Sequence, residues 1–278
     1  MHFPMLFLAL FGFLQILPPN TTFLRGNGTT FWMNVDSLPG LYDRRGNELI
    51  RPQWSVVQPT HFQNRTLVSI GGTALGGTIT GASWGVIDST GLSVVPPIFD
   101  EIDLGDTPFR LFPTIEFIVR KGQFWGLLDS NGKERIALEF SSIKGTLHPD
   151  LRLVQKSNTM WGVMDIAQGK EVIPLVYQDI TPLNASLFLA RSSSRNIAHT
   201  TPLYGIISSN STIVAPFVYE AVNVFLLPAP LLAVRRKGFW GVLDYSRKGE
   251  CREIVPCRYR STRQSAWRKH LAVVIGKK

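Results

Sequence analysis

The sequence predicts an all-β fold built from tandem antiparallel β-sheet repeats of about 40 residues, and three observations predict it. First, Trp-Gly or Tyr-Gly pairs recur at positions 84, 125, 161, 204 and 240, at spacings of 36 to 43 residues. Second, short segments in which apolar and polar residues alternate flank these pairs, as in half-buried strands. Third, the chain holds 18 Pro and 24 Gly without a long stretch of helical periodicity, which is typical of many short strands and turns.

The clearest copy of the repeat spans residues 161–180. It reads Trp-Gly-Val-Met-Asp, a linker to Gly169, Lys-Glu-Val-Ile-Pro, then Tyr177 and Ile180. The copies at positions 84 and 125 follow it closely, the copy at 240 carries extra residues before its proline, and the copies at 40 and 204 are degenerate. Further alternating segments lie upstream, at residues 66–70, 116–120, 151–155, 187–191 and 231–235. We therefore expect four strands a copy, with residues 271–275 as a last, lone strand.

Each recurring residue has a physical role in these strands. Asp accepts hydrogen bonds from N–H groups of the following turn, where Gly supplies positive φ, and Pro ends a strand or lies at a sheet edge because it cannot donate to the ladder. We expect the Trp to pack between neighbouring repeats and its Gly to allow close approach. The residues assigned these structural roles are Trp84, Gly85, Asp88, Trp125, Gly126, Asp129, Trp161, Gly162, Asp165, Tyr204, Gly205, Trp240, Gly241 and Asp244.

The complete pattern, Trp-Gly-φ-φ-Asp-x-x-Gly-x-x-φ-φ-Pro-x-x-aromatic-acid-x-Ile with φ apolar, resembles that of the WG-repeat (KWG-repeat) family. The resemblance covers residues 30–278, with three strong copies, one good copy with an insertion and two weak ones. It implies β-rich tandem repeats, which are common in bacterial proteins and often exported. It implies no activity, because the family has no shared chemistry.

The repeats predict one β domain at residues 20–278 after an apolar segment at residues 1–19. We place about six units, at roughly 30–65, 66–115, 116–150, 151–186, 187–230 and 231–278. A propeller-like ring and an open curved array both fit, since the sequence does not show whether the ends meet. The Gly- and Thr-rich insertion at residues 69–83 fits either an elongated hairpin or a mobile loop.

The N-terminal segment and the cysteines bear on location. Residues 3–17 are almost wholly apolar, which suits the core of a secretory signal, although no Lys or Arg precedes them and no small-x-small cleavage site follows. We expect a secreted or cell-envelope protein; a signal-anchor, a mis-set start codon or a buried strand in a cytoplasmic protein are the alternatives. Cys251 and Cys257 would lie ~20 Å apart along a straight strand, so they can pair only if the chain turns back.

The net charge of +9 is concentrated at the C-terminal end. Residues 234–278 hold thirteen Lys and Arg against three acids, a net charge of +10. Such a field attracts an acidic polysaccharide, lipid head groups or nucleic acid, although a solvated face without a partner also fits. Interleaved aromatic residues can stack on bases, but Tyr259 is the repeat's own aromatic residue, so we do not expect nucleic acid as the partner. The candidate contacts are Arg247, Lys248, Arg258, Arg260, Arg263, Arg268 and Lys269.

Patterns that resemble catalytic or metal sites each lack part of their context. Ser83 lies in a Gly-x-Ser-x-Gly sequence, but a strand and not a helix is expected after it, and the Gly-rich residues 71–78 lack the lysine of a phosphate loop. The acids Asp100, Glu101, Asp103 and Asp106 fit a cation site or a solvated cluster, and the five His show no metal-binding spacing.

We therefore expect no catalytic residue, cofactor or metal, and no membrane span beyond an N-terminal anchor. The function expected is that of a non-catalytic scaffold that binds protein, glycan or an anionic surface. The alternative is a propeller-like carbohydrate-active enzyme with carboxylates gathered at one mouth of the array.

Overall fold

The computed structural model describes residues 20–26, 29–60, 64–75, 78–104, 116–157, 159–193, 202–246, 250–263 and 265–275. These residues form antiparallel β-sheets and one short helix, which confirms the predicted fold of tandem β-repeats. The expected N-terminal signal or anchor lies outside the described residues. The chain divides into two compact units, with the boundary between Leu138 and Glu139.

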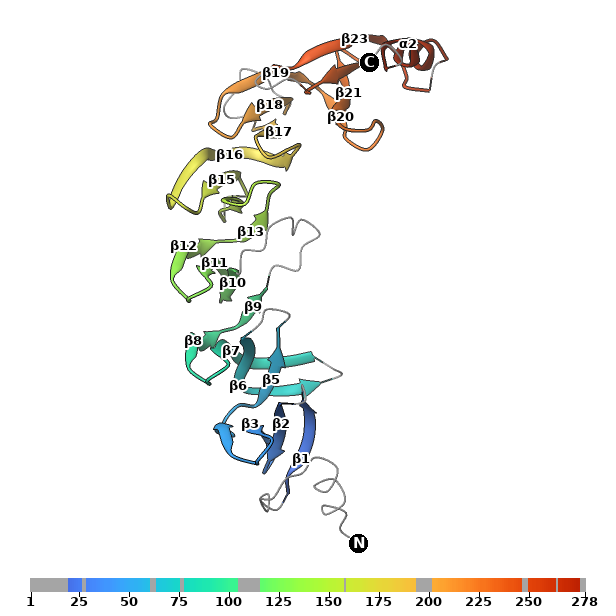
Figure 1. Cartoon of the computed structure of the whole chain (residues 1–278). Coiled ribbons are helices and arrows are strands. Elements are labelled where there is room, and N and C mark those ends of the chain that lie inside the picture. Colours follow the sequence, from blue (N-terminus) through green and yellow to red (C-terminus); the bar gives the residue numbers. More distant parts are fainter. Residues whose placement is uncertain are drawn as a thin grey trace. The chain divides into compact units, whose positions relative to one another are not determined.

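The first unit holds three four-stranded sheets, each in chain order (Figure 1). The first consists of β1 (Thr22–Gly26), β2 (Thr30–Val35), β3 (Leu38–Asp43) and β4 (Glu48–Ile50). The second consists of β5 (Val56–Pro59), β6 (Arg65–Leu75), β7 (Thr78–Asp88) and β8 (Ser93–Phe99). The third consists of β9 (Glu101–Asp103), β10 (Glu116–Lys121), β11 (Phe124–Asp129) and β12 (Glu134–Phe140), whose end lies beyond the unit boundary.

The second unit holds a seven-stranded and a four-stranded sheet. The larger consists of β13 (Ser142–Gly145), β14 (Leu151–Gln155), β15 (Trp161–Asp165), β16 (Lys170–Pro182), β17 (Leu187–Ser192), β18 (Tyr204–Ser208) and β19 (Ile213–Tyr219). Its long strand β16 belongs to two successive repeats, because Tyr177 pairs with Trp161 on one side and with Ser192 on the other. The smaller sheet consists of β20 (Ala221–Asn223), β21 (Leu231–Arg236), β22 (Phe239–Asp244) and β23 (Arg252–Tyr259).

The sheets and the sequence copies are out of step by one strand. The short segment that closes each sequence copy pairs with the upstream strand of the next copy, as Ile102 of β9 does with Val119 of β10. At the last sheet, Val222 of β20 pairs with Val234 of β21 in the same way. The sheets after the first therefore take their first strand from the preceding copy, and the copies that share a sheet are joined by backbone hydrogen bonds as well as by packing.

Successive sheets within a unit pack through alternate residues of their strands, as the two-residue period of a strand requires. In β21, Leu232 and Val234 join Leu189 and Ile206 of the preceding repeat in one buried cluster. The alternate residues Leu231 and Ala233 face the opposite side of the sheet, together with Val242 and Val255. Both faces of this last sheet are therefore apolar and covered.

The insertion at residues 69–83 is an elongated hairpin. Strands β6 and β7 remain paired from Arg65 opposite Asp88 to Leu75 opposite Thr78. Both positive-φ residues on the β6 side, Gly71 and Gly72, lie within this ladder. The sequence fits either an elongated hairpin or a mobile loop, and the described residues form the elongated hairpin.

The lone closing strand expected at residues 271–275 is wrong, because these residues belong to α2 (Ser265–Ile275), which follows β23 (Figure 1). Trp267 and Leu271 are four residues apart and therefore lie on one side of the helix, where they pack against the apolar face of the last sheet. A short apolar run is compatible with a strand or with a helix. The helix is favoured here because it covers the apolar face of the last sheet. No helix among the described residues is long and apolar enough to cross a bilayer.

Candidate functional site

The glycine of each aromatic-glycine pair lies beneath an irregular part of the neighbouring strand. Val163 pairs with Ile173 and Trp161 with Tyr177, so β16 bulges over Gly162. A Cβ atom on Gly162 would lie 2.7 Å from the carbonyl oxygen of Ile173. Equivalent distances to a carbonyl oxygen at Gly85, Gly126, Gly205 and Gly241 are 2.6, 2.9, 2.9 and 2.5 Å. The recurring glycine is thus required for close approach of two backbones.

The proline of the repeat lies in the same bulge. Pro174 follows Ile173 at the point where β16 leaves the regular ladder, and Pro256 occupies the equivalent place in β23. A bulged residue needs no N–H donor for the ladder. The strand continues past the proline in both cases.

The recurring aspartates hold the hairpin turns after the aromatic-glycine strands. Oδ1 of Asp88 accepts hydrogen bonds from the N–H groups of Thr90 and Leu92, at 2.8 and 3.0 Å. Asp43 and Asp129 make the same pair of bonds, and Asp165 and Asp244 accept bonds from the N–H groups of Ala167 and Ser246. In the degenerate copy, Ser208 Oγ replaces the carboxylate and accepts from Thr212 N–H.

Hydrogen bonding lowers the pKa of three of these carboxyl groups. The side chain of Asn47 is the main cause at Asp43, and that of Thr90 is the main cause at Asp88. At Asp129 burial acts to raise the pKa, but hydrogen bonds and the charge of Arg135 outweigh it and lower the pKa. The carboxylates are therefore committed to turns in their charged form.

A basic side chain covers most of the recurring aromatic rings. Arg120, Arg191 and Arg235 lie over Trp125, Tyr204 and Trp240, 5.6 to 5.9 Å from the ring centroids, and each is the direct cross-strand neighbour of its ring. Lys144 takes this place over Trp161, at 4.5 Å. The rings are half-buried, and Trp84 and Trp161 pack against clusters that join their own sheet to the following repeat.

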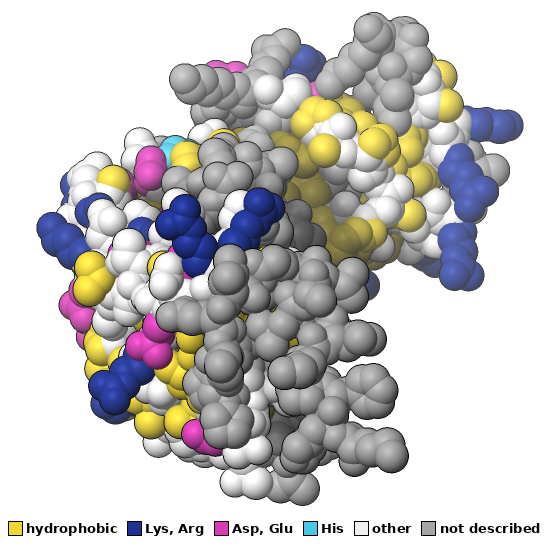
Figure 2. All heavy atoms as spheres, turned by 60° about the horizontal axis from the view of Figure 1, so that its bottom comes forward, with side chains coloured by type: hydrophobic (Ala, Val, Ile, Leu, Met, Phe, Trp, Pro, Cys, Tyr) yellow, Lys and Arg dark blue, Asp and Glu magenta, His cyan; other side chains and the backbone are white. Residues whose placement is uncertain are grey.

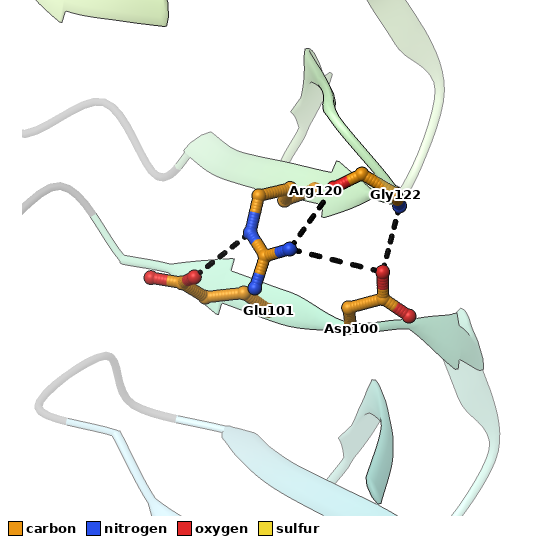
Figure 3. Close-up of polar contacts among 4 residues, drawn as sticks. All are labelled: Asp100, Glu101, Arg120 and Gly122. Atoms are coloured by element: carbon orange, nitrogen blue, oxygen red, sulfur yellow. Dashed lines mark hydrogen bonds and ion pairs between the residues drawn. The ribbon is translucent and has the colours of Figure 1, made fainter. Parts of the chain in front are cut away.

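Arg120 also binds the acids of the preceding copy (Figure 3). Its Nε donates to the Glu101 carboxylate at 3.0 Å, and its Nη1 donates to the Gly122 carbonyl and lies 3.8 Å from Asp100. Asp100 in turn accepts the Gly122 N–H at 2.7 Å. The pair Arg235 and Glu220 repeats this ion pair at 3.5 Å in the last sheet. The arrangement therefore joins consecutive copies through one basic residue.

Three segments of the chain, residues 84–104, 125–146 and 161–191, match the sequence model described as "WG containing repeat". These segments are WG repeats. The bulge and the aspartate turn of these WG repeats recur at Trp240, and the bulge recurs at Tyr204, where serine replaces the aspartate. The copies at Tyr204 and Trp240 thus keep these features of the WG repeats.

No curated protein sequence matches the chain. Among solved structures, Kluyveromyces lactis Hsv2 is similar at 9% identity over 79% of this chain and 72% of that chain, with a TM-score of 0.35. BamB from Moraxella catarrhalis is 13% identical over 85% and 76%, and the Neurospora crassa Pan2 WD40 domain is 10% identical over 82% and 76%, both with a TM-score of 0.31. These scores are too low to establish a shared arrangement of the sheets.

The residues that resemble catalytic or metal sites have structural surroundings. Ser83 lies in β7 opposite Ile70, and the strand continues to Asp88, so the elbow geometry of a nucleophile is missing there. Asp100 and Glu101 bind Arg120, and Asp106 lies outside the described residues. No group of three His, Cys, Asp or Glu that could hold a metal occurs in the described part of the chain.

The candidate anion contacts are brought together at the end of the second unit. Arg258 and Arg260 lie at the end of β23, Arg263 in the connection to α2, and Arg268 and Lys269 on α2; all five are exposed. Arg247 and Lys248 lie outside the described residues. Tyr259 Oη and His270 Nδ1 are 2.9 Å apart, and Arg258 Nη2 lies 3.3 Å from the same His270 atom, which ties the helix to β23.

Six basic residues of this segment have no acidic partner among the described residues: Arg252, Arg258, Arg260, Arg263, Arg268 and Lys269. Within the described residues, none of these six side chains forms an ion pair, whereas Arg235 and Arg236 bind Glu220 and Glu253. All six residues are exposed to solvent.

Sequence reasoning missed the loop between β20 and β21. Phe225 is 94% exposed and Leu226 is 42% exposed, although the neighbouring Leu227 packs against a buried cluster. The available signal was the run Val-Phe-Leu-Leu before Pro228, where turn residues are expected between strands. A run of large apolar residues at a turn indicates a contact surface.

The cysteine residues Cys251 and Cys257 carry free thiols. Both pack against the cluster that joins the last two repeats, and the intervening segment is strand β23, so the chain does not turn back between them. Burial, more than the nearby acids Asp244 and Glu253, raises the pKa of Cys251 to about 11 and of Cys257 to about 12. Both thiols are therefore protonated at neutral pH.

Proposed function

We propose that the chain is a non-catalytic WG-repeat scaffold that binds an anionic partner through the C-terminal end of its second unit. The observation that carries this proposal is the group Arg252, Arg258, Arg260, Arg263, Arg268 and Lys269, whose charges have no acidic partner among the described residues. Elsewhere the basic side chains Arg120, Arg135 and Lys156 bind acids. A local excess of positive charge steers and holds an oppositely charged partner.

The role of the recurring aspartates in the repeats supports a scaffold and not an enzyme. The recurring carboxylates of Asp43, Asp88, Asp129, Asp165 and Asp244 accept turn N–H groups. Glycoside hydrolysis would need two carboxyl groups that face one bond of the substrate. Each of these carboxylates is engaged in a separate turn, so they stabilise the repeats and are not paired for catalysis.

A charge variant tests the proposal on immobilised sulfated polysaccharide. We expect the substitutions Arg260→Gln, Arg263→Gln, Arg268→Gln and Lys269→Gln, made together, to lower markedly the salt concentration needed for elution, because exposed charges act through a field that salt screens. The matched control removes the same charge from other exposed positions: Arg45→Gln, Arg51→Gln, Lys133→Gln and Lys170→Gln. Equal elution of the two variants would contradict the proposal.

We further propose that the protein acts outside the cytoplasm. The apolar residues 3–17 support this, since their length suits the core of an export signal. Cell fractionation and N-terminal sequencing of the recovered protein provide the test. Recovery of the chain from the cytoplasm with residues 1–19 intact would contradict export.

A further inference from the structure

The β20–β21 loop exposes apolar side chains in a fixed conformation. The Phe225 N–H donates to Asn223 Oδ1 at 3.0 Å, and the Leu231 N–H donates to the Pro228 carbonyl at 3.0 Å. The Tyr245 N–H donates to the Pro230 carbonyl at 3.0 Å, which joins the loop to the end of β22. Phe225 and Leu226 are therefore displayed by a loop that is fastened on both sides.

Helix α2 adjoins this loop and carries a mixed outer surface. Leu227 of the loop and Leu271 of α2 pack against the same cluster, in which Trp267 is 3% exposed. On the outer side of the helix, Arg268 and Lys269 are each followed four residues later by an exposed apolar residue, Ala272 and Val273. Basic and small or medium-sized apolar side chains therefore share the exposed side of this short helix.

In the view of Figure 2, both hydrophobic side chains and Lys or Arg side chains reach the surface of the molecule. Transfer of the exposed side chains of Phe225, Leu226 and Val273 from water to an apolar medium is favourable. Neither a polysaccharide nor a phosphate backbone provides such a medium for aliphatic groups. The positive charges of Arg260, Arg263, Arg268 and Lys269 attract anions. An anionic bilayer supplies both within a few ångströms of depth.

We propose that the β20–β21 loop and α2 form a docking surface for an anionic lipid bilayer. Phe225 and Leu226 insert at the boundary between head groups and acyl chains, and Arg260, Arg263, Arg268 and Lys269 contact the head groups. This inference rests on the proposed function, since it names the anionic partner that the same end of the chain binds. The bilayer is bound peripherally, through one loop and the exposed side of one helix.

Vesicle sedimentation tests the inference with the full chain. The expected result is binding to vesicles of phosphatidylglycerol mixed with phosphatidylcholine and much weaker binding to phosphatidylcholine alone, because each basic residue near an anionic surface adds to the attraction. The double variant Phe225→Ser/Leu226→Ser should lower the partition coefficient at least ~10-fold, since it removes the apolar part of the contact. The control Leu92→Ser/Ile213→Ser changes two other exposed apolar residues and should bind like the parent protein.

A fluorescent probe separates insertion from mere attraction. Phe225→Cys can be labelled selectively at neutral pH, because burial keeps the thiols of Cys251 and Cys257 protonated. A polarity-sensitive dye at position 225 should shift its emission to the blue in anionic vesicles, whereas the same dye on Leu92→Cys should not. Absence of a shift at position 225 would overturn insertion of the loop.

The outcomes distinguish this inference from the proposed function. If the parent protein binds sulfated polysaccharide or single-stranded DNA but no anionic vesicle, the bilayer proposal is overturned and anion binding stands. If Phe225→Ser/Leu226→Ser sediments with anionic vesicles as well as the parent does, the docking surface is wrong. If the parent binds none of the three anionic partners, the proposed function fails together with the inference.

Discussion

The guanidinium group of Arg120 lies over the ring of Trp125, 5.7 Å from its centroid, and binds Glu101 of the preceding copy with its Nε. One side chain thus meets an aromatic ring of its own WG repeat and an acid supplied by the repeat before it. Because β9, the first strand of this sheet, comes from the preceding copy, this contact lies where two copies are joined.

We predict that this contact contributes measurably to stability. Arg120→Ala should lower the free energy of unfolding by about 1–2 kcal/mol, the sum expected for an exposed cation–π contact and a partly exposed ion pair. A double-mutant cycle of Arg120→Ala with Glu101→Gln should give a coupling of about 0.2–1 kcal/mol that decreases at high salt. Urea unfolding measures both. A coupling of zero would show that the ion pair does not join the copies energetically.

The WG glycine should not tolerate even one extra carbon atom. Gly162→Ala would place its Cβ 2.7 Å from the Ile173 carbonyl oxygen, so the bulge of β16 must move. We expect a loss of about 1–3 kcal/mol in the free energy of unfolding. The control is Gly169→Asn, at a turn position with φ of 65° and open space, where Asn is tolerated. A similar loss at both sites would mean that backbone crowding is not the cause.

Stability should fall in acid through the turn aspartates. The folded state lowers the pKa of Asp88 and Asp129 below the ordinary value of 3.8, so the unfolded chain binds more protons as the pH falls through this region. Their contribution is present above the unfolded pKa and is lost as the pH falls through the lower folded pKa. Asp88→Asn/Asp129→Asn keeps the acceptor oxygens but removes the titration.

We expect the double variant to lose less stability than the parent between about pH 5 and pH 2. Thermal unfolding across this interval measures the difference. Glu171→Gln removes an exposed carboxylate in strand β16 and provides the control. A pH dependence in Asp88→Asn/Asp129→Asn identical to that of the parent would exclude the turn carboxylates as its source.

Trp267 should hold α2 on the last sheet. Its side chain is 3% exposed, and its Nε1 is buried without a hydrogen-bond partner among the described residues. Trp267→Ala should therefore cost about 3–5 kcal/mol through loss of packing. Trp267→Phe keeps most of the ring and removes the unpaired donor, so its cost should stay under about 1.5 kcal/mol. Equal losses in the two variants, measured by urea unfolding, would contradict this role of the ring.

The local features of the fold follow from the sequence more closely than its connections do. Alternating residues predicted the strands, such as β14 and β21, and the turn chemistry of Asp88 depends only on its neighbours along the chain. The offset of one strand between the sequence copies and the sheets depends on the pairing of residues such as Ile102 and Val119. The repeat pattern does not encode this pairing. Sequence periodicity reveals that units recur, but not where one sheet ends.

The C-terminal helix and the exposed loop escaped prediction for a related reason. The apolar run at residues 271–275 is too short to distinguish a strand from a helix, and the choice depends on the sheet face that Trp267 covers. The exposure of Phe225 likewise depends on how its loop is fastened to Asn223 and Tyr245. In both cases tertiary surroundings decide what local preference leaves open.

The cover that α2 provides has a consequence for how many molecules assemble. The face formed by Leu231, Ala233, Val242 and Val255 has the same apolar character as the faces on which neighbouring repeats stack. A chain shortened after Ser261 would present this face to solvent and should self-associate, seen as a concentration-dependent increase in light scattering. In the intact chain, α2 keeps this apolar face of the last sheet away from other molecules.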